Sequence, residues 1–256
     1  MRASAARPVA SASRSRVLIK QQSANHYFCD QPAAYMNILV IAPHPDDEVL
    51  GCGGSIAYHV ARGDTVHVLV VTRGDPEIFP PAIVEKTRGE LARAHQVLGI
   101  ASVEFLDFPA PKLDSVPGYQ LADAIGKSVK RLAPRTLYLP HRGDLHSDHR
   151  KVFDAALVAA RPINGCSVRT ILSYETLSET EWGYPLGTDV FSPTVYIDIS
   201  RHLERKLKAL GCYQSQLMPA PHPRSLQAVE TLARHRGSAI NAAAAEAFVL
   251  VRDIVA

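Results

Sequence analysis

Short apolar runs alternate with longer amphipathic segments along the chain from Met36 onward. The apolar runs are rich in Val, Ile and Leu, which is typical of strands that are buried on both faces. We expect strands at residues 38–42, 66–72, 103–106, 136–139, 170–174 and 195–199. The amphipathic segments predict helices at residues 54–62, 82–98, 121–132, 148–160, 201–215 and 226–236.

The segment before Gly99 illustrates the helical pattern. Leu91, Ala94, Val97 and Leu98 fall on one helical face, and Gly99 provides a stop signal. Strands that are each followed by a helix indicate an α/β fold, in which helices cover both faces of a mostly parallel sheet.

The chain is long enough for one large domain. It has 256 residues, 46% of them hydrophobic, and no linker or repeat divides residues 36–256. Residues 1–35 are rich in Ser, Ala and Arg and poor in acidic residues. We interpret them as a disordered or artefactual leader, with a transit peptide as the less favoured alternative and Met36 as a candidate start.

The positive net charge belongs to the leader. Residues 1–35 hold five basic residues and one acidic residue, whereas the remainder holds 23 basic and 24 acidic residues. The domain therefore carries no basic surplus, and we do not expect a nucleic-acid partner. No apolar run reaches the ~18 residues of a membrane span. Four scattered cysteines without a CxxC pair favour reduced thiols and a cytoplasmic protein.

Polar loops follow three of the predicted strands. The first is His-Pro-Asp-Asp-Glu at residues 44–48, the second is 72–75, and the third is 140–149. In an open α/β sheet, ligands bind beyond the carboxyl ends of the strands. The three loops are therefore expected to meet at one edge of the sheet.

Two of these loops carry the residue types of a metal site. Residues 141–149 contain three His and two Asp, and Ser147 is expected to cap a helix that begins at Asp148. Three adjacent acids at 46–48 repel one another, and a divalent cation would relieve that repulsion. His with Asp suits Zn²⁺ or Fe²⁺ and leaves positions open for water.

The motifs "APHPDDEVLGCGG" and "HSDHR" together resemble the LmbE/PIG-L family. "TRGELARAHQVLGI", "KLKALGCYQSQ" and "RGSAINAAAAEAF" extend the resemblance over most of residues 37–255. It implies a Rossmann-like three-layer fold and a zinc-dependent de-N-acetylase, with iron as an alternative metal. The implied substrate is a small N-acetylglucosamine-type conjugate, whose hydrolysis releases acetate and a free amine.

The resemblance also implies roles for individual residues. It makes His44, Asp47 and His149 the metal ligands and Asp46 the general base that activates water. His146 would then polarise the amide carbonyl or protonate the departing amine, and Asp148 would orient His146.

Other residues keep open interpretations. Glu48 either supports the metal ligands or caps the following helix, and His141 and Asp144 are candidates to support the site. Arg73 and Arg224 are candidate substrate-binding residues, with a surface salt bridge as the alternative for Arg73. We expect structural roles for Cys52, Tyr213, Gln216 and the glycines of "GCGG", which would allow close helix–strand packing.

One departure from the family pattern concerns the sugar contacts. After the third strand, an acidic residue is expected, but Ala110 stands there and Asp107 and Asp114 are placed differently. Two other functions remain possible at this point, a metallohydrolase of another amide or ester and a nucleotide-binding protein that holds Mg²⁺. Homo-oligomers are also compatible with the sequence.

Overall fold

The computed structural model describes residues 35–184 and 187–255, and the fold is formed by the unit Tyr35–Ala256. The expected leader at residues 1–35 lies outside the described residues, apart from Tyr35. The assignment of that leader therefore stays a prediction.

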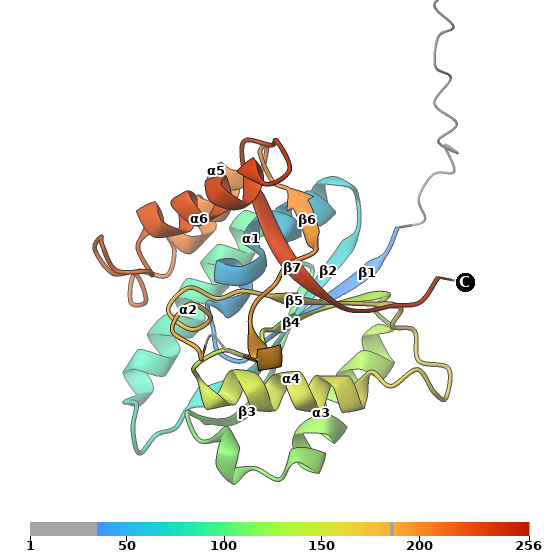
Figure 1. Cartoon of the computed structure of the whole chain (residues 1–256). Coiled ribbons are helices and arrows are strands. Elements are labelled where there is room, and N and C mark those ends of the chain that lie inside the picture. The colour runs from blue at the N-terminus through green and yellow to red at the C-terminus, as the bar shows by residue number, and fades with distance from the viewer. Residues whose placement is uncertain (1–34, 185–186, 256) are drawn as a thin grey trace, which may run out of the picture. The chain divides into compact units, whose positions relative to one another are not determined.

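A seven-stranded sheet forms the centre of the fold, in the order β3-β2-β1-β4-β5-β7-β6 (Figure 1). The first five strands pair in parallel, whereas β7 pairs antiparallel to both β5 and β6. The strands are β1 Asn37–Ala42, β2 Thr65–Gly74, β3 Ser102–Ala110, β4 Thr136–Pro140, β5 Thr170–Tyr174, β6 Val195–Asp198 and β7 Ala245–Asp253.

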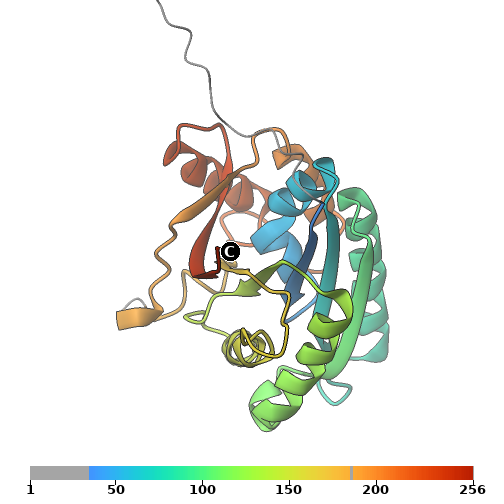
Figure 2. The same cartoon turned by 90° about the vertical axis from the view of Figure 1, so that its right-hand side faces the viewer.

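Helices cover both faces of this sheet. Figure 1 shows α3 and α4 on one face and α1, α2, α5 and α6 on the other, and Figure 2 shows these layers from the side. The helices are α1 Asp47–Ala61, α2 Pro81–Leu98, α3 Gly118–Leu132, α4 Ser147–Ala159, α5 Leu203–Leu210 and α6 Leu226–Ser238, with 3₁₀ turns at Leu113–Ser115 and Gly187–Asp189. The predicted α/β fold with three layers and a mostly parallel sheet is confirmed.

The central strand explains why the apolar runs are continuous. Ile38 and Val40 pack into the apolar cluster on the α1 and α2 face, whereas Leu39 and Ile41 pack into the cluster on the α3 and α4 face. All four side chains are fully buried. Both faces of β1 thus need apolar residues. The sequence of β1 therefore lacks the alternation of apolar and polar residues that a half-exposed strand shows.

Several elements differ from the expected bounds, and three of the differences are informative. Helix α1 begins at Asp47 instead of residue 54, because its early glycines lie inside the helix and do not form a turn. Helix α5 ends at Leu210, short of the expected residue 215. Strand β7 was missed, because its alanine-rich start does not look like a strand even though the sheet buries it.

The glycines of α1 allow the helix to lie close to its neighbours. A Cβ atom added at Gly54 would lie 2.5 Å from Cδ1 of the buried Ile199. Such a distance is well below an ordinary van der Waals contact. The predicted packing role of "GCGG" is confirmed at this position.

We expect Gly54→Ala to lower the free energy of unfolding, because overpacking of about 1–3 kcal/mol outweighs the helix propensity that Ala gains over Gly. Gly126→Ala in α3 is the matched control, since its added Cβ meets only Ala159 Cβ, 3.9 Å away. Gly126→Ala should leave stability unchanged or raise it by up to ~1 kcal/mol. Denaturant unfolding measures both variants, and a Gly54→Ala protein as stable as the control would contradict the close packing.

Candidate active site

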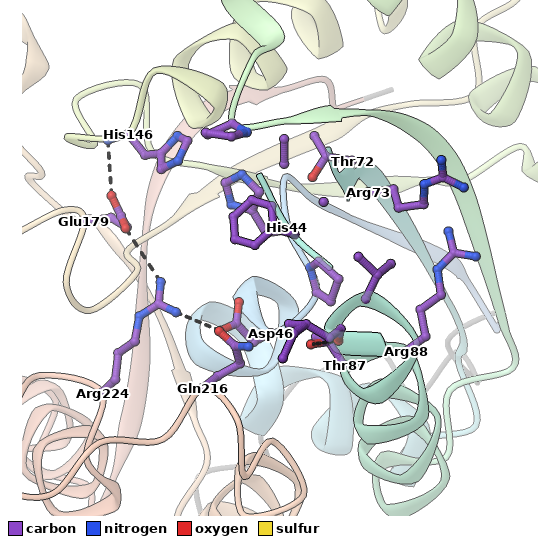
Figure 3. Close-up of a pocket in the computed structure, with 17 residues that line it drawn as sticks. His44, Asp46, Thr72, Arg73, Thr87, Arg88, His146, Glu179, Gln216 and Arg224 are labelled. Carbon is purple, nitrogen blue, oxygen red and sulfur yellow. Dashed lines mark hydrogen bonds and ion pairs between the residues drawn. The ribbon is translucent and has the colours of Figure 1, made fainter. Parts of the chain in front are cut away.

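Two loops at the carboxyl end of the sheet bring the candidate residues together. Strand β1 leads through His44 and Asp46 into α1, and β4 leads through His146 into α4. A cavity of about 230 Å³ opens between them (Figure 3). It is lined by His44, Pro45, Asp46, Thr72, Arg73, Gly74, Phe79, Ile83, Val84, Thr87, Arg88, Ala110, Pro111, His146, Glu179, Gln216 and Arg224.

The three expected metal ligands lie close together, and one of them, His44, also lines the cavity. Asp47 Oδ2 lies 3.3 Å from His44 Nδ1 and 3.3 Å from His149 Nε2. The His44 backbone N–H donates to the same oxygen at 2.9 Å. These side chains form a possible ligand set for a metal ion.

A second possible ligand set consists of His44, His146 and Asp148. His44 Nε2 lies 3.0 Å from Asp148 Oδ2, and Asp148 Oδ1 accepts the Leu113 N–H at 3.1 Å. Because Asp148 engages Nε2 of His44, the nitrogen left for a set with Asp47 and His149 is Nδ1, which lies near Asp47. The hydrogen bonds therefore favour the first set as the metal site, with Asp148 holding His44 in place.

The role expected for Asp148 needs a correction. Its carboxylate lies on His44, and only its backbone N–H reaches His146, donating to Nδ1 at 3.1 Å. His146 is thereby the N-cap of α4, whereas Ser147, the expected cap, is the first helical residue. Asp148 thus orients His146 through the backbone, not through its side chain.

The donor atoms of the first set fit a metal ion. Asp47 Oδ1 and His149 Nε2 are buried, and neither has a hydrogen-bond partner within the described part of the chain. His149 Nδ1 lies 2.8 Å from Asp144 Oδ2, and Asp144 in turn accepts from Thr180 Oγ1 at 2.6 Å. A carboxylate behind a ligating imidazole is the usual support of a metal ligand.

The electrostatics of these residues also favour a cation. Burial opposes a charged His44, but hydrogen bonds to Asp148 and Asp47 outweigh it and raise the pKa to about 9. Burial likewise opposes charge on His149, and Asp47 and Asp144 raise its pKa. Burial disfavours the Asp47 carboxylate, yet His149 and His44 hold its pKa well below the usual value. The site therefore attracts positive charge, which a bound metal ion would supply.

Asp46 is directed away from this metal set by its backbone. Its φ of 116° is a left-handed conformation that non-glycine residues seldom adopt. The carboxylate lines the cavity, and its Oδ2 accepts from Arg224 Nη1 at 3.0 Å. Burial raises the pKa of Asp46 to about 7, while the positive charge of Arg224 acts in the opposite direction.

Arg224 connects Asp46 with the loop that follows β5. Its Nε donates to Ser178 Oγ at 2.8 Å, and its Nη2 lies 3.6 Å from Glu179 Oε1. Glu179 Oε2 accepts the His146 backbone N–H at 3.1 Å, which completes a bridge from Asp46 to His146 (Figure 3). The expected substrate-binding residue Arg224 lines the cavity, but its guanidinium nitrogens already interact with protein side chains.

Sequence reasoning missed Ser178 and Glu179. No motif marks them, and the only available signal was their position after the carboxyl end of β5, where ligands bind in such sheets.

The two remaining arginines of the cavity differ in their partners. Arg88 forms an ion pair with Asp107 and lies over the Phe105 ring, 4.4 Å from its centroid. Arg73 is exposed at the rim and makes no side-chain hydrogen bond or ion pair with any described residue. Arg73 is therefore free to meet a ligand, whereas Asp107, a possible sugar contact, is engaged by Arg88.

The other expected supporting residues take distinct positions. Asp144 supports His149, whereas His141 Nε2 lies 2.8 Å from the Asp189 carbonyl oxygen, outside both ligand sets. Cys52 and Tyr213 are buried in the core, and Gln216 lines the cavity although a structural role was expected. The Glu48 carboxylate accepts from the N–H of Asp46, the N-cap residue of α1, and from Tyr213, whereas none of its hydrogen bonds within the described part of the chain goes to an expected metal ligand.

Comparison of the sequence with those of known proteins places the chain in a family. The sequence pattern of the family described as PIG-L, GlcNAc-PI de-N-acetylase, matches residues 39–160. The uncharacterized deacetylase YaiS of Escherichia coli (strain K12) is 32% identical over 149 residues, which are 55% of this chain and 74% of YaiS. This chain belongs to the PIG-L, or LmbE-type, deacetylase family. Members of this family are metal-dependent deacetylases.

One further relative and one solved structure extend the likeness. The 1D-myo-inositol 2-acetamido-2-deoxy-alpha-D-glucopyranoside deacetylase of Kineococcus radiotolerans is 31% identical over 166 residues, 51% of this chain and 45% of that enzyme. This chain thus spans about half the length of that relative. The crystal structure of the conserved protein TT1542 from Thermus thermophilus matches with a TM-score of 0.69 and 27% identity, covering 86% of this chain and 97% of TT1542.

The His149→Ala variant should lose its metal, because one of three protein ligands is removed and the Asp144 carboxylate behind it is left buried. His141→Ala is the matched control, since it removes a neighbouring buried histidine outside the ligand sets. Elemental analysis of the purified proteins measures the result. Equal metal content in the two variants would remove His149 from the ligand set.

Proposed function

We propose that this protein hydrolyses the N-acetyl group of an N-acetylglucosamine-type conjugate and releases acetate and a free amine. The observation that supports this proposal is that Asp46 and His146 line the same cavity as His44, which belongs to the His44, Asp47 and His149 set. The Kineococcus relative is named for a deacetylation of this kind. Amide hydrolysis needs an activated water, stabilisation of an oxyanion and a proton for the leaving amine, and this site has a candidate for each.

In this proposal, a divalent metal held by His44, Asp47 and His149 supplies Lewis-acid activation of water and of the amide carbonyl. Zn²⁺ is the proposed ion and Fe²⁺ is the alternative, because two histidines and one carboxylate suit both. Asp46 accepts the proton of the attacking water. A carboxylate with a pKa near neutrality is well matched to that task, and the positive charge of Arg224 favours its ionised form against the effect of burial.

His146 polarises the carbonyl through a hydrogen bond when its ring is neutral, or supplies the proton to the leaving amine when its ring is the imidazolium. Its Nδ1 accepts the Asp148 N–H, so the neutral ring carries its proton on Nε2. Burial and the nearby His44 lower the pKa of His146, which favours this neutral form. The hydrogen bond at Nδ1 thus fixes the tautomer in which Nε2 is the donor.

The rim of the cavity gives the conjugate two kinds of contact. Arg73 offers unpaired donors to a sugar hydroxyl or a phosphate, and Phe79, Ile83 and Val84 form an apolar wall. We propose a small-molecule conjugate and no nucleic-acid partner. None of the helices in the described part of the chain combines the length and the apolarity that a membrane crossing requires. A cytoplasmic location, supported by free thiols at Cys52, Cys166 and Cys212, and a homo-oligomeric state stay proposals.

An acetate-release assay on a panel of N-acetylated amino-sugar conjugates tests the proposed function. The wild-type protein should release acetate from at least one conjugate, lose that activity after metal chelation, and regain it with Zn²⁺ or Fe²⁺. The panel should include simple esters and other amides, which test the rival metallohydrolase. Tight nucleotide binding with Mg²⁺ and no hydrolysis would instead support a nucleotide-binding protein and contradict the proposal.

A further inference from the structure

The backbone of Asp46 is in a conformation that needs support. A non-glycine residue at positive φ costs of order 1–3 kcal/mol, and such a conformation persists only where surrounding contacts hold it. Asp46 has a φ of 116°, immediately before the first turn of α1. Its side chain makes no capping hydrogen bond to the helix, so the support has to come from elsewhere.

The support is a buried carboxylate two residues further on. Glu48 Oε2 accepts the Asp46 N–H at 3.1 Å, and Glu48 is fully buried. Glu48 Oε1 accepts from the Tyr213 hydroxyl at 2.5 Å and lies 3.1 Å from His95 Nε2. His95 comes from α2 and Tyr213 from the segment after α5, so two separate elements hold Glu48 in place.

The same turn sends two adjacent carboxylates to different partners. The Asp46 carboxylate accepts from Arg224 at the cavity, whereas the Asp47 carboxylate pairs with His44 and His149. If Asp46 relaxed to negative φ, its carboxylate would leave the position from which it reaches the cavity. A displacement of about 1 Å at a reacting group can cost on the order of 10²-fold in rate.

We propose that Glu48 is a positioning residue that holds the turn at Asp46 through its N–H, and that Tyr213 and His95 in turn hold Glu48. This inference rests on the proposed function only in giving Asp46 the role of base. The alternative is a purely structural polar network, which would change stability without changing the reaction.

Three variants and one control separate these two roles. Glu48→Ala removes the acceptor of the Asp46 N–H, and Glu48→Gln restores an acceptor oxygen without the charge. Tyr213→Phe removes only the hydroxyl that holds Glu48. Tyr138→Phe is the matched control, because its buried hydroxyl bonds His59 instead, 2.8 Å away. For each protein, kcat, KM, metal content and melting temperature are measured.

We expect Glu48→Ala to lower kcat by on the order of 10- to 100-fold with unchanged metal content and little change in KM. Glu48→Gln should recover most of this loss, and Tyr213→Phe should lower kcat several-fold. Tyr138→Phe should lose stability but keep its kcat below the melting temperature. Should Glu48→Ala fail to fold, Tyr213→Phe decides between the roles.

The proposal is overturned if folded Glu48→Ala or Tyr213→Phe has the wild-type kcat, if Glu48→Gln is as slow as Glu48→Ala, or if the variants lose metal. A crystal structure of one slow variant gives a test that needs no turnover. Asp46 should leave positive φ and lose its contact with Arg224. If the wild-type protein releases no acetate, the proposed function fails, whereas this displacement would still support the positioning role.

Discussion

Five carboxylates lie buried at one edge of the sheet, and their mutual repulsion constrains everything else in the site. They belong to Asp46, Asp47, Glu48, Asp144 and Asp148, each at most 2% exposed. A buried carboxylate is costly unless it is paired or hydrogen-bonded. Each of the five lies against at least one counter-group, although Asp47 and Asp148 share His44, and Asp47 and Asp144 share His149. The helix N-termini of α1 and α4 add favourable dipoles. Asp47 Oδ1 and His149 Nε2 are nevertheless buried without a hydrogen-bond partner among the described residues, and a cation bound between them would satisfy both.

The supporting groups come from distant parts of the chain. Arg224 lies before α6, Tyr213 follows α5, and Glu179 follows β5, yet all three contact the loops after β1 and β4 or the start of α1. The loops therefore depend on the folded sheet and its outer helices for their geometry. A short motif can supply the ligands, but the whole domain is needed to fix where they point.

Sequence alone predicted most of the fold and which candidate residues lie close together. The apolar runs predicted that the loops holding His44, Asp47 and His149 meet at one edge of the sheet, and these three side chains do lie together. The sequence could not place Arg224 on Asp46 or the Asp148 carboxylate on His44, because pairings across 178 and 104 residues are set by tertiary packing. Nor could it show the positive φ at Asp46, since aspartate adopts that conformation more often than most residues but still only rarely.

In the proposed mechanism, one backbone turn divides two adjacent aspartates between proton transfer and metal binding. Metal content and turnover of Asp46→Asn and Asp47→Asn, measured side by side, test it most directly. Asp46→Asn should keep its metal and lose about 10²–10⁴-fold in turnover, because an amide cannot accept the proton. Asp47→Asn should lose metal affinity, because a neutral oxygen replaces a charged ligand. Metal loss in Asp46→Asn together with intact metal and rate in Asp47→Asn would contradict the roles of Asp46 as base and Asp47 as ligand.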